Sequence, residues 1–125
     1  MLEYKGDIDI KVNLQNGIYT FRNNSGIGKS YLVSLLKSYA ADGEPVMAYT
    51  YTDMIIGVQF NNVVKPGEQK LLVIDRYDLY SDAFTEQIEK FAETGVVLID
   101  IKGSTNLQSK LCYLDMTEHM IEVSE

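Results

Sequence analysis

The sequence predicts an α/β fold with a mainly parallel central sheet, because strand-like and helix-like segments alternate along the chain. Two continuous apolar runs each end in a carboxylate: Leu71–Ile74 is followed by Asp75, and Val96–Ile99 is followed by Asp100. Such runs are typical of parallel strands that are covered on both faces. We therefore expect helices to flank the sheet.

Two segments have the spacing of amphipathic helices. The first covers residues 29–41 and ends at Asp42-Gly43, a pair that terminates helices. The second is expected to begin near Ser81, which can cap a helix, and to run to about Glu93. The side chains expected to face the core are Leu32, Leu35, Leu36, Tyr39, Phe84, Ile88 and Phe91.

Strand patterns near both ends of the chain predict antiparallel strand pairs. Apolar and polar residues alternate over 8–12, the Asn-Gly pair at 16–17 is a hairpin signal, and 18–21 follows as the returning strand. Residues 111–114 and 120–123 predict a second pair joined by a turn. The expected fold is therefore a parallel sheet with antiparallel strands at the N- and C-terminal ends.

The middle of the chain is less regular. Residues 46–51 predict a strand, 53–60 fit either a helix or a strand, and 65–68 predict a turn. No linker or repeat divides the sequence, and 125 residues with 46% hydrophobic residues suit one core. We expect a single domain over residues 1–125.

Charge and composition exclude several classes of function. The formal net charge is −7 and the basic residues are scattered, so direct binding of nucleic acid is not expected. The chain lacks the apolar stretch of a signal peptide or a membrane span, so we expect a cytoplasmic protein without membrane insertion. The one cysteine, Cys112, predicts a small buried side chain in a strand.

Residues 23–30 nearly match GxxxxGK[S/T], the phosphate-binding P-loop pattern. Small residues let consecutive backbone N–H groups surround phosphate oxygens, and a helix beginning at Lys29 adds its positive end. The first position is Asn23 instead of Gly, and Asn tolerates left-handed backbone angles nearly as well. The alternative is an ordinary strand-to-helix turn with a chance Lys-Ser pair. The residues expected to bind the nucleotide are Asn23, Asn24, Ser25, Gly26, Ile27, Gly28, Lys29, Ser30 and Tyr31.

The expected ligand is ATP, or another nucleotide such as GTP, together with Mg²⁺. Lys29 would reach the terminal phosphates, and the Ser30 hydroxyl would bind Mg²⁺. Asp75, at the tip of a buried strand downstream, is where a Walker B carboxylate would complete the metal site. The alternative for Asp75 is a plain aspartate in the turn after a strand.

The order of these segments resembles the nucleotide-binding domain of ABC and SMC-type ATPases, a family of P-loop NTPases. The P-loop of that family typically reads SGxGKS followed by T and L, and the matching residues here are Ser25–Leu32. The resemblance implies that Gln59 belongs to a glutamine loop that contacts Mg²⁺ or the attacking water. It also implies an ATPase fold over nearly the whole chain, although only the P-loop is a specific match.

The departures from the family concern catalysis. Arg76 stands where the family has a catalytic Glu after the Walker B Asp, and no switch His follows Asp100. The signature segment and its helical subdomain are absent, since the interval from Gln59 to Lys70 is too short for them. The resemblance therefore implies binding with weak or partner-dependent hydrolysis. Asp100 could position water, or could be a simple strand-end carboxylate.

Two further functions stay open. A degenerate P-loop fold could act as a regulatory module that binds a protein partner or a second copy of the chain. The run Asp75-Arg76-Tyr77 resembles the DRY-type motif of thymidylate kinases, which would give Arg76 a role in phosphoryl transfer; a surface ion pair is the alternative. A Ser-His-Asp triad is not expected, because His119 is the only histidine and lies in a predicted terminal turn.

Overall fold

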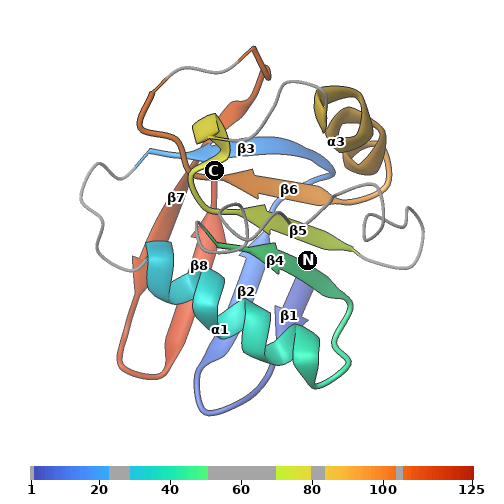
Figure 1. The fold of residues 1–125 in the computed structure, drawn as a ribbon. Helices are drawn as coiled ribbons and strands as arrows, with labels where there is room; N and C mark the ends of the chain where they lie inside the picture. The colour runs from blue at the N-terminus through green and yellow to red at the C-terminus, as the bar shows by residue number, and fades with distance from the viewer. Residues whose placement is uncertain (1, 23–28, 51–69, 80–83, 104–105) are drawn as a thin grey trace.

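The structure, a computed structural model, describes residues 2–22, 29–50, 70–79, 84–103 and 106–125. In these residues, strands form one sheet that two α-helices accompany (Figure 1). The strands are β1 (Leu2–Tyr4), β2 (Asp9–Asn13), β3 (Gly17–Phe21), β4 (Val46–Tyr49), β5 (Leu71–Ile74), β6 (Val96–Ile99), β7 (Lys110–Met116) and β8 (Met120–Ser124). The helices are α1 (Lys29–Ala41), the 3-10 helix η2 (Tyr77–Leu79) and α3 (Thr85–Ala92). The mixed α/β class predicted from the sequence is confirmed.

The strand order is β1-β2-β8-β7-β3-β6-β5-β4. From β7 to β4 every neighbouring pair is parallel, whereas β1–β2 and β7–β8 are antiparallel. The predicted C-terminal strand pair is therefore confirmed. β5 and β6 consist entirely of Leu, Val and Ile, and all four residues are buried in each of β4, β5 and β6.

The predicted N-terminal hairpin is wrong. β2 pairs with β1 on one side and with β8 on the other, and β3 pairs with β6 and β7. The Asn-Gly signal is local, whereas β3 gains two parallel partners by crossing into the centre of the sheet. Gly17 there has φ +150°, and its N–H donates to the carbonyl oxygen of Gly95. The short strand β1 was not predicted at all.

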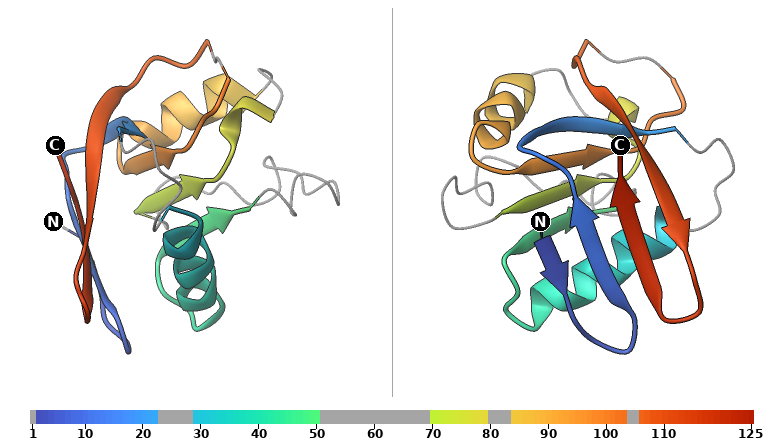
Figure 2. Two further views of the ribbon diagram at one scale, coloured as in Figure 1. Left: turned by 90° about the vertical axis from the view of Figure 1, so that its left-hand side faces the viewer. Right: turned by 180° about the vertical axis from the view of Figure 1, so that it is seen from behind.

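The sheet curls around α1. In the left view of Figure 2, β1, β2, β7 and β8 stand beside this helix and the remaining strands lie above it. Leu32 and Leu36 of α1 share one buried cluster with Ile10 and Val123 from the curled half and Val73 from the parallel half. α1 is thus held between the two halves of the sheet.

The opposite face of the parallel strands is covered by α3. Ile88 and Phe91 of this helix pack on Leu72, Ile74 and Val97, which alternate with the side chains that face α1. The turn from α3 into β6 passes very close to its neighbours, because a Cβ on Gly95 would lie 2.8 Å from Phe91 Cε1 and 2.9 Å from the carbonyl oxygen of Lys70. Glycine is the residue that fits this approach.

The first predicted helix is confirmed over its whole range. α1 spans residues 29–41, and Gly43 follows with φ +94°, a left-handed angle that suits glycine at a helix end. The second helix begins at Thr85, and the expected cap at Ser81 lies outside the described residues. Cys112 is fully buried in β7, as predicted. Within the described residues, no helix is both long and apolar enough to cross a membrane.

Leu36 and Leu35 offer a matched test of the core. Leu36 is fully buried in the cluster around α1, and the neighbouring Leu35 is only partly buried. We expect Leu36→Ala to lower the free energy of unfolding by about 2–4 kcal/mol, because it removes buried methyl groups and leaves a cavity. Leu35→Ala should cost less than half as much. Urea denaturation of the purified variants measures both, and equal losses would contradict the packing described for α1.

Candidate active site

The carboxyl ends of the parallel strands bring two aspartates together. Ile74 and Ile99 are register partners in β5 and β6, so the next residues, Asp75 and Asp100, are neighbours at the same edge. The backbone continues this pairing, since the N–H of Asp100 donates to the carbonyl oxygen of Ile74 at 3.0 Å. Only 8% of Asp75 and 5% of Asp100 is exposed. Two carboxyl groups thus lie buried side by side.

Asp100, at the end of β6, lies where the chain changes direction across the sheet, and Asp75 follows the next strand, β5. From β3 the chain passes through α1 to β4 at the far edge, and from β6 it passes to β7 on the other side of β3. The connections of the neighbouring strands β3 and β6 therefore leave in opposite directions. In α/β sheets, the crevice at the carboxyl ends of two such strands is the usual place for a ligand.

Lys29 reaches this edge from the first residue of α1. Its Nζ lies 3.1 Å from Oδ1 of Asp100, and both side chains are at most 10% exposed. A buried ion pair of this kind contributes little net stability, because removing both charges from water offsets their attraction. Lys29 can reach Asp100 because β6 lies next to β3, the strand that precedes α1.

Asp75 lies against Asp100 and next to the start of α1. Burial, and then the neighbouring carboxyl group of Asp100, raise the pKa of Asp75 above its ordinary value. Arg76 and a hydrogen bond from the Ser30 hydroxyl act in the opposite direction. Ser30 and Asp75, the two residues expected to bind metal, are thus in contact. Their oxygen atoms are of the kind that Mg²⁺ prefers.

Arg76 and Asp78 form a fork just beyond β5. Nε of Arg76 donates to Oδ1 of Asp78 at 3.2 Å, and Nη2 donates to Oδ2 at 3.1 Å. Asp78 also accepts the backbone N–H groups of Lys102 and Gly103, in the loop after β6. These donors, Arg76 first, hold the pKa of the Asp78 carboxyl below its usual range. The loops that follow β5 and β6 are therefore tied together.

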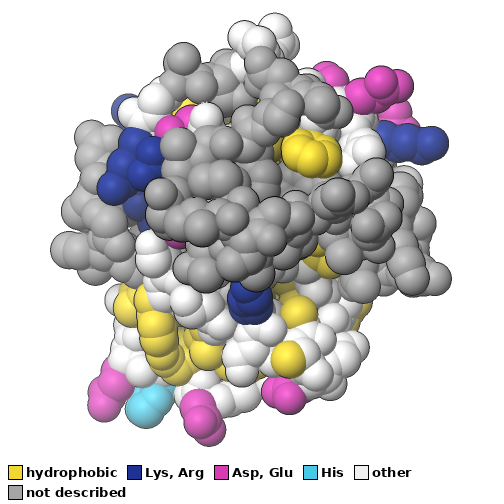
Figure 3. Space-filling view, viewed as in Figure 1, with side chains coloured by type: hydrophobic (Ala, Val, Ile, Leu, Met, Phe, Trp, Pro, Cys, Tyr) yellow, Lys and Arg dark blue, Asp and Glu magenta, His cyan; other side chains and the backbone are white. Residues whose placement is uncertain are grey.

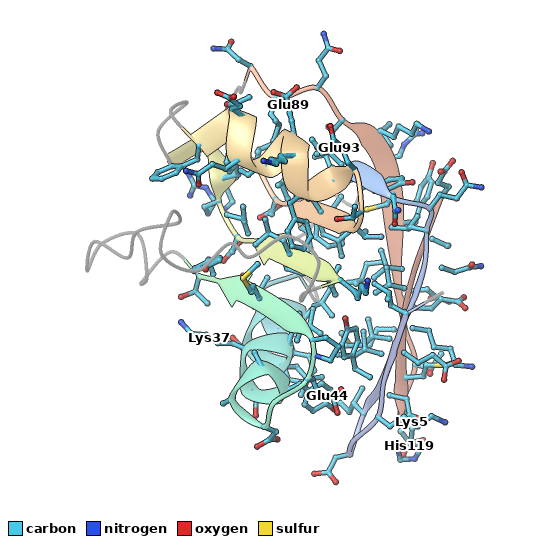
Figure 4. All side chains as sticks on the ribbon, turned by 90° about the vertical axis from the view of Figure 1, so that its right-hand side faces the viewer. Lys5, Lys37, Glu44, Glu89, Glu93 and His119 are labelled. Carbon is cyan, nitrogen blue, oxygen red and sulfur yellow. The ribbon has the colours of Figure 1, made fainter. Side chains whose placement is uncertain are left out.

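The other residues predicted from the sequence divide into two groups. The segment 23–28 and Gln59 lie outside the described residues. Tyr31, expected to bind nucleotide, has 48% of its surface exposed on α1. His119 is exposed in the turn between β7 and β8, as predicted; it lies at the lower edge of the face in Figure 3 and is labelled in Figure 4.

Asp78, Lys102 and Gly103 were missed by sequence reasoning. Asp78 stands two residues after Arg76, which is a weak local signal for a fork. The contact with Lys102 and Gly103 has no signal in the sequence, because 24 or 25 positions separate these residues from Asp78. It arises only because β5 and β6 are neighbours in the sheet.

In the described part of the chain, no group of three or more His, Cys, Asp or Glu side chains is arranged to hold a metal ion. Comparisons of the chain with models of protein families, with curated proteins and with solved structures found no match.

The buried pair of carboxyl groups, Asp75 and Asp100, is expected to lower the stability of the fold. We expect Asp75→Asn to raise the free energy of unfolding at pH 7 by about 1 kcal/mol, because it removes one of two buried like charges. The asparagine can still contact both Ser30 and Asp100. Glu89→Gln, which removes the same charge from the exposed side of α3 (Figure 4), should change stability by less than about 0.5 kcal/mol. Thermal and urea unfolding measure these changes, and a less stable Asp75→Asn would contradict the assignment.

Proposed function

We propose that this chain binds the phosphates of a nucleoside triphosphate or diphosphate, with Mg²⁺, at the carboxyl edge of β3, β5 and β6. The observation that carries the proposal is the buried Lys29–Asp100 pair in contact with Asp75 and, through it, Ser30. These four residues come from three segments that are distant in the sequence. They also stand at the beginning of α1, where backbone N–H groups favour an anion.

The energetic cost of this arrangement supports a functional role. Two carboxyl groups and one ammonium group are buried together, and neither the ion pair nor the carboxyl pair is an efficient way to stabilise a fold. Buried charges of this kind gather at functional sites. A cation ligand between Asp75 and Asp100, and an anion facing Lys29, would relieve the unfavourable interactions.

Each residue has a role in the proposed complex. The ammonium group of Lys29 binds phosphate oxygens, while Ser30 and Asp75 hold Mg²⁺. Magnesium is commonly bound by one or two carboxylates together with substrate phosphates, and this partial set of protein ligands fits that pattern. The metal neutralises phosphate charge when it is bound. Residues 23–28 are expected to surround the phosphates with backbone N–H groups.

The proposal also concerns the fold family, the cellular compartment and the partners of the chain. The passage from β3 to the helix that begins with Lys29-Ser30, and the carboxyl-end aspartates, support a P-loop NTPase-like fold that resembles a minimal ABC or SMC-type nucleotide-binding domain. We further propose a cytoplasmic protein that favours ATP and acts with a protein partner or as a homodimer.

Binding without efficient turnover is the form of activity that these contacts support. In the described part of the chain, the carboxyl groups near the edge are all engaged: Asp75 with Ser30 and Asp100, Asp100 with Lys29, and Asp78 with Arg76. A general base needs a carboxylate that faces the attacking water. Each of these groups is instead held by a neighbouring side chain.

The nucleotide site is tested with Lys29 and a matched lysine in the same helix. We expect Lys29→Ala to weaken binding of fluorescent ATP with Mg²⁺ by at least about tenfold, since it removes a charged hydrogen-bond donor to phosphate. Lys37→Ala, an exposed position on α1 (Figure 4), should change affinity by less than about twofold.

Ser30→Ala gives a second measurement that keeps every charged group, although it removes the hydrogen bond to Asp75. It should reduce the gain in affinity that Mg²⁺ provides, while binding in excess chelator stays unchanged. Thermal melts of every variant ensure that binding is measured on folded protein. If the unaltered chain binds no nucleotide up to millimolar concentration, the proposed function is wrong.

A regulatory protein-binding module is the second candidate, favoured by the outer side of β7. Leu111 and Tyr113, which alternate with the buried Cys112 and Leu114, are 49% and 43% exposed, and Arg22 lies over the Tyr113 ring at 5.6 Å. Large apolar side chains gathered on one strand are a feature of contact surfaces.

Fast turnover would exclude the regulatory candidate. We expect the isolated chain to release phosphate from ATP at no more than about 0.01 per second, far below typical enzyme rates, because the described carboxyl groups at this edge are already engaged. A malachite-green assay with Lys29→Ala as the blank measures this release. Phosphate release at enzyme-like rates that Lys29→Ala abolishes would establish an ATPase and remove the regulatory candidate.

A further inference from the structure

Arg76 has an unusual backbone conformation at the end of β5. Its φ is +56°, and no other non-glycine residue in the described part of the chain has a positive φ. This left-handed angle costs free energy for any residue with a Cβ, and surrounding contacts must hold it in place. Such residues gather at ligand sites, where the strain directs a side chain. Arg76 directly follows Asp75, so the strain lies at the proposed nucleotide site.

Asp78 is the contact that holds Arg76. One carboxylate accepts four hydrogen bonds: two from the Arg76 guanidinium and two from the backbone N–H groups of Lys102 and Gly103. The Asp78 side chain is only 9% exposed. A Cβ on Gly103 would lie 3.3 Å from Oδ2 of Asp78, so glycine permits the close approach. The carboxylate therefore sets the direction of the guanidinium.

The guanidinium group also lies near the carboxyl pair. The charges of Asp100 and Asp75 both act on Arg76, and Asp100 is the residue that pairs with Lys29. Two cations from separate segments, Lys29 from α1 and Arg76 directly after Asp75, therefore lie in the neighbourhood of the same pair of carboxyl groups. Asp78 engages two of the five N–H donors of the guanidinium, which leaves donors for a second acceptor.

We propose that Arg76, positioned by Asp78, binds the terminal phosphate of a nucleoside triphosphate and so determines selectivity for the triphosphate over the diphosphate. This inference rests on the proposed function. A planar guanidinium binds carboxylate and phosphate with the same fork geometry, which an ammonium group does not reproduce. Lys29 is already paired with Asp100, so a terminal phosphate bearing about two charges gains from a second cation.

The test compares fluorescent ATP and ADP, each with Mg²⁺, on the full chain. In Arg76→Ala we expect the affinity for ATP to fall by at least about tenfold and the affinity for ADP to change by less than about threefold. Arg76→Lys keeps the charge without the fork and should recover only part of the ATP affinity. Lys5→Ala removes the same charge from a side chain that is 75% exposed beyond β1, and should leave the ATP-to-ADP ratio unchanged.

Arg76→Gly separates ligand binding from a structural role. Glycine adopts φ +56° without strain, so this variant should melt at the same temperature as Arg76→Ala or higher. It should nevertheless lose the same selectivity. An unchanged ATP-to-ADP ratio in both variants would overturn the role of Arg76 while leaving the nucleotide site intact. Failure of the unaltered chain to bind either nucleotide would overturn the proposed function, and this inference with it.

Discussion

The position of β6 between β3 and β5 is the constraint on which the rest of the structure depends. Parallel hydrogen bonding on both sides aligns the carboxyl ends of these three strands, so the residues that follow them meet at one edge. Asp100 consequently lies beside Asp75 and within 3.1 Å of Lys29. Because β5 and β6 are neighbours, Asp78 after β5 also accepts hydrogen bonds from the backbone that follows β6. A different strand order would separate all of these groups.

Both halves of the sheet help to hold the carboxyl ends of these strands in place. The parallel half carries the charged groups, and its faces are covered by α1 and α3. The curled half packs on the other side of α1, which fixes the helix whose first residue is Lys29. Tyrosine hydroxyls tie the halves together: Tyr39 of α1 donates to the carbonyl oxygen of Ile8 at 2.6 Å, and Tyr4 of β1 to that of Pro45 at 3.2 Å. Rigid elements therefore position the buried lysine.

The charges at the edge form one connected arrangement. Lys29 offsets Asp100, Ser30 offsets part of the cost of Asp75, and Asp78 holds Arg76 close to both aspartates. Burial of Lys29, Asp75 and Asp100 makes the interactions between them stronger than they would be in water, and makes any uncompensated charge there more costly. A metal–phosphate ligand is chemically suited to such a set, because it brings both signs of charge at once. This complementarity is the physical basis of the proposed function.

Local patterns in the sequence determined the elements and the chemistry of individual positions. The apolar runs before Asp75 and Asp100 became β5 and β6, and the spacing over 29–41 became α1 with Leu32 and Leu36 in the core. These patterns are readable because burial imposes a period on each element separately. The tertiary structure alone decided which strands are neighbours: it replaced the hairpin expected at 16–17 with two parallel pairings of β3. It also decided that Asp100 pairs with Lys29 and that Asp78 joins two loops, because contacts between distant segments depend on the whole packing and leave no periodic trace in the chain.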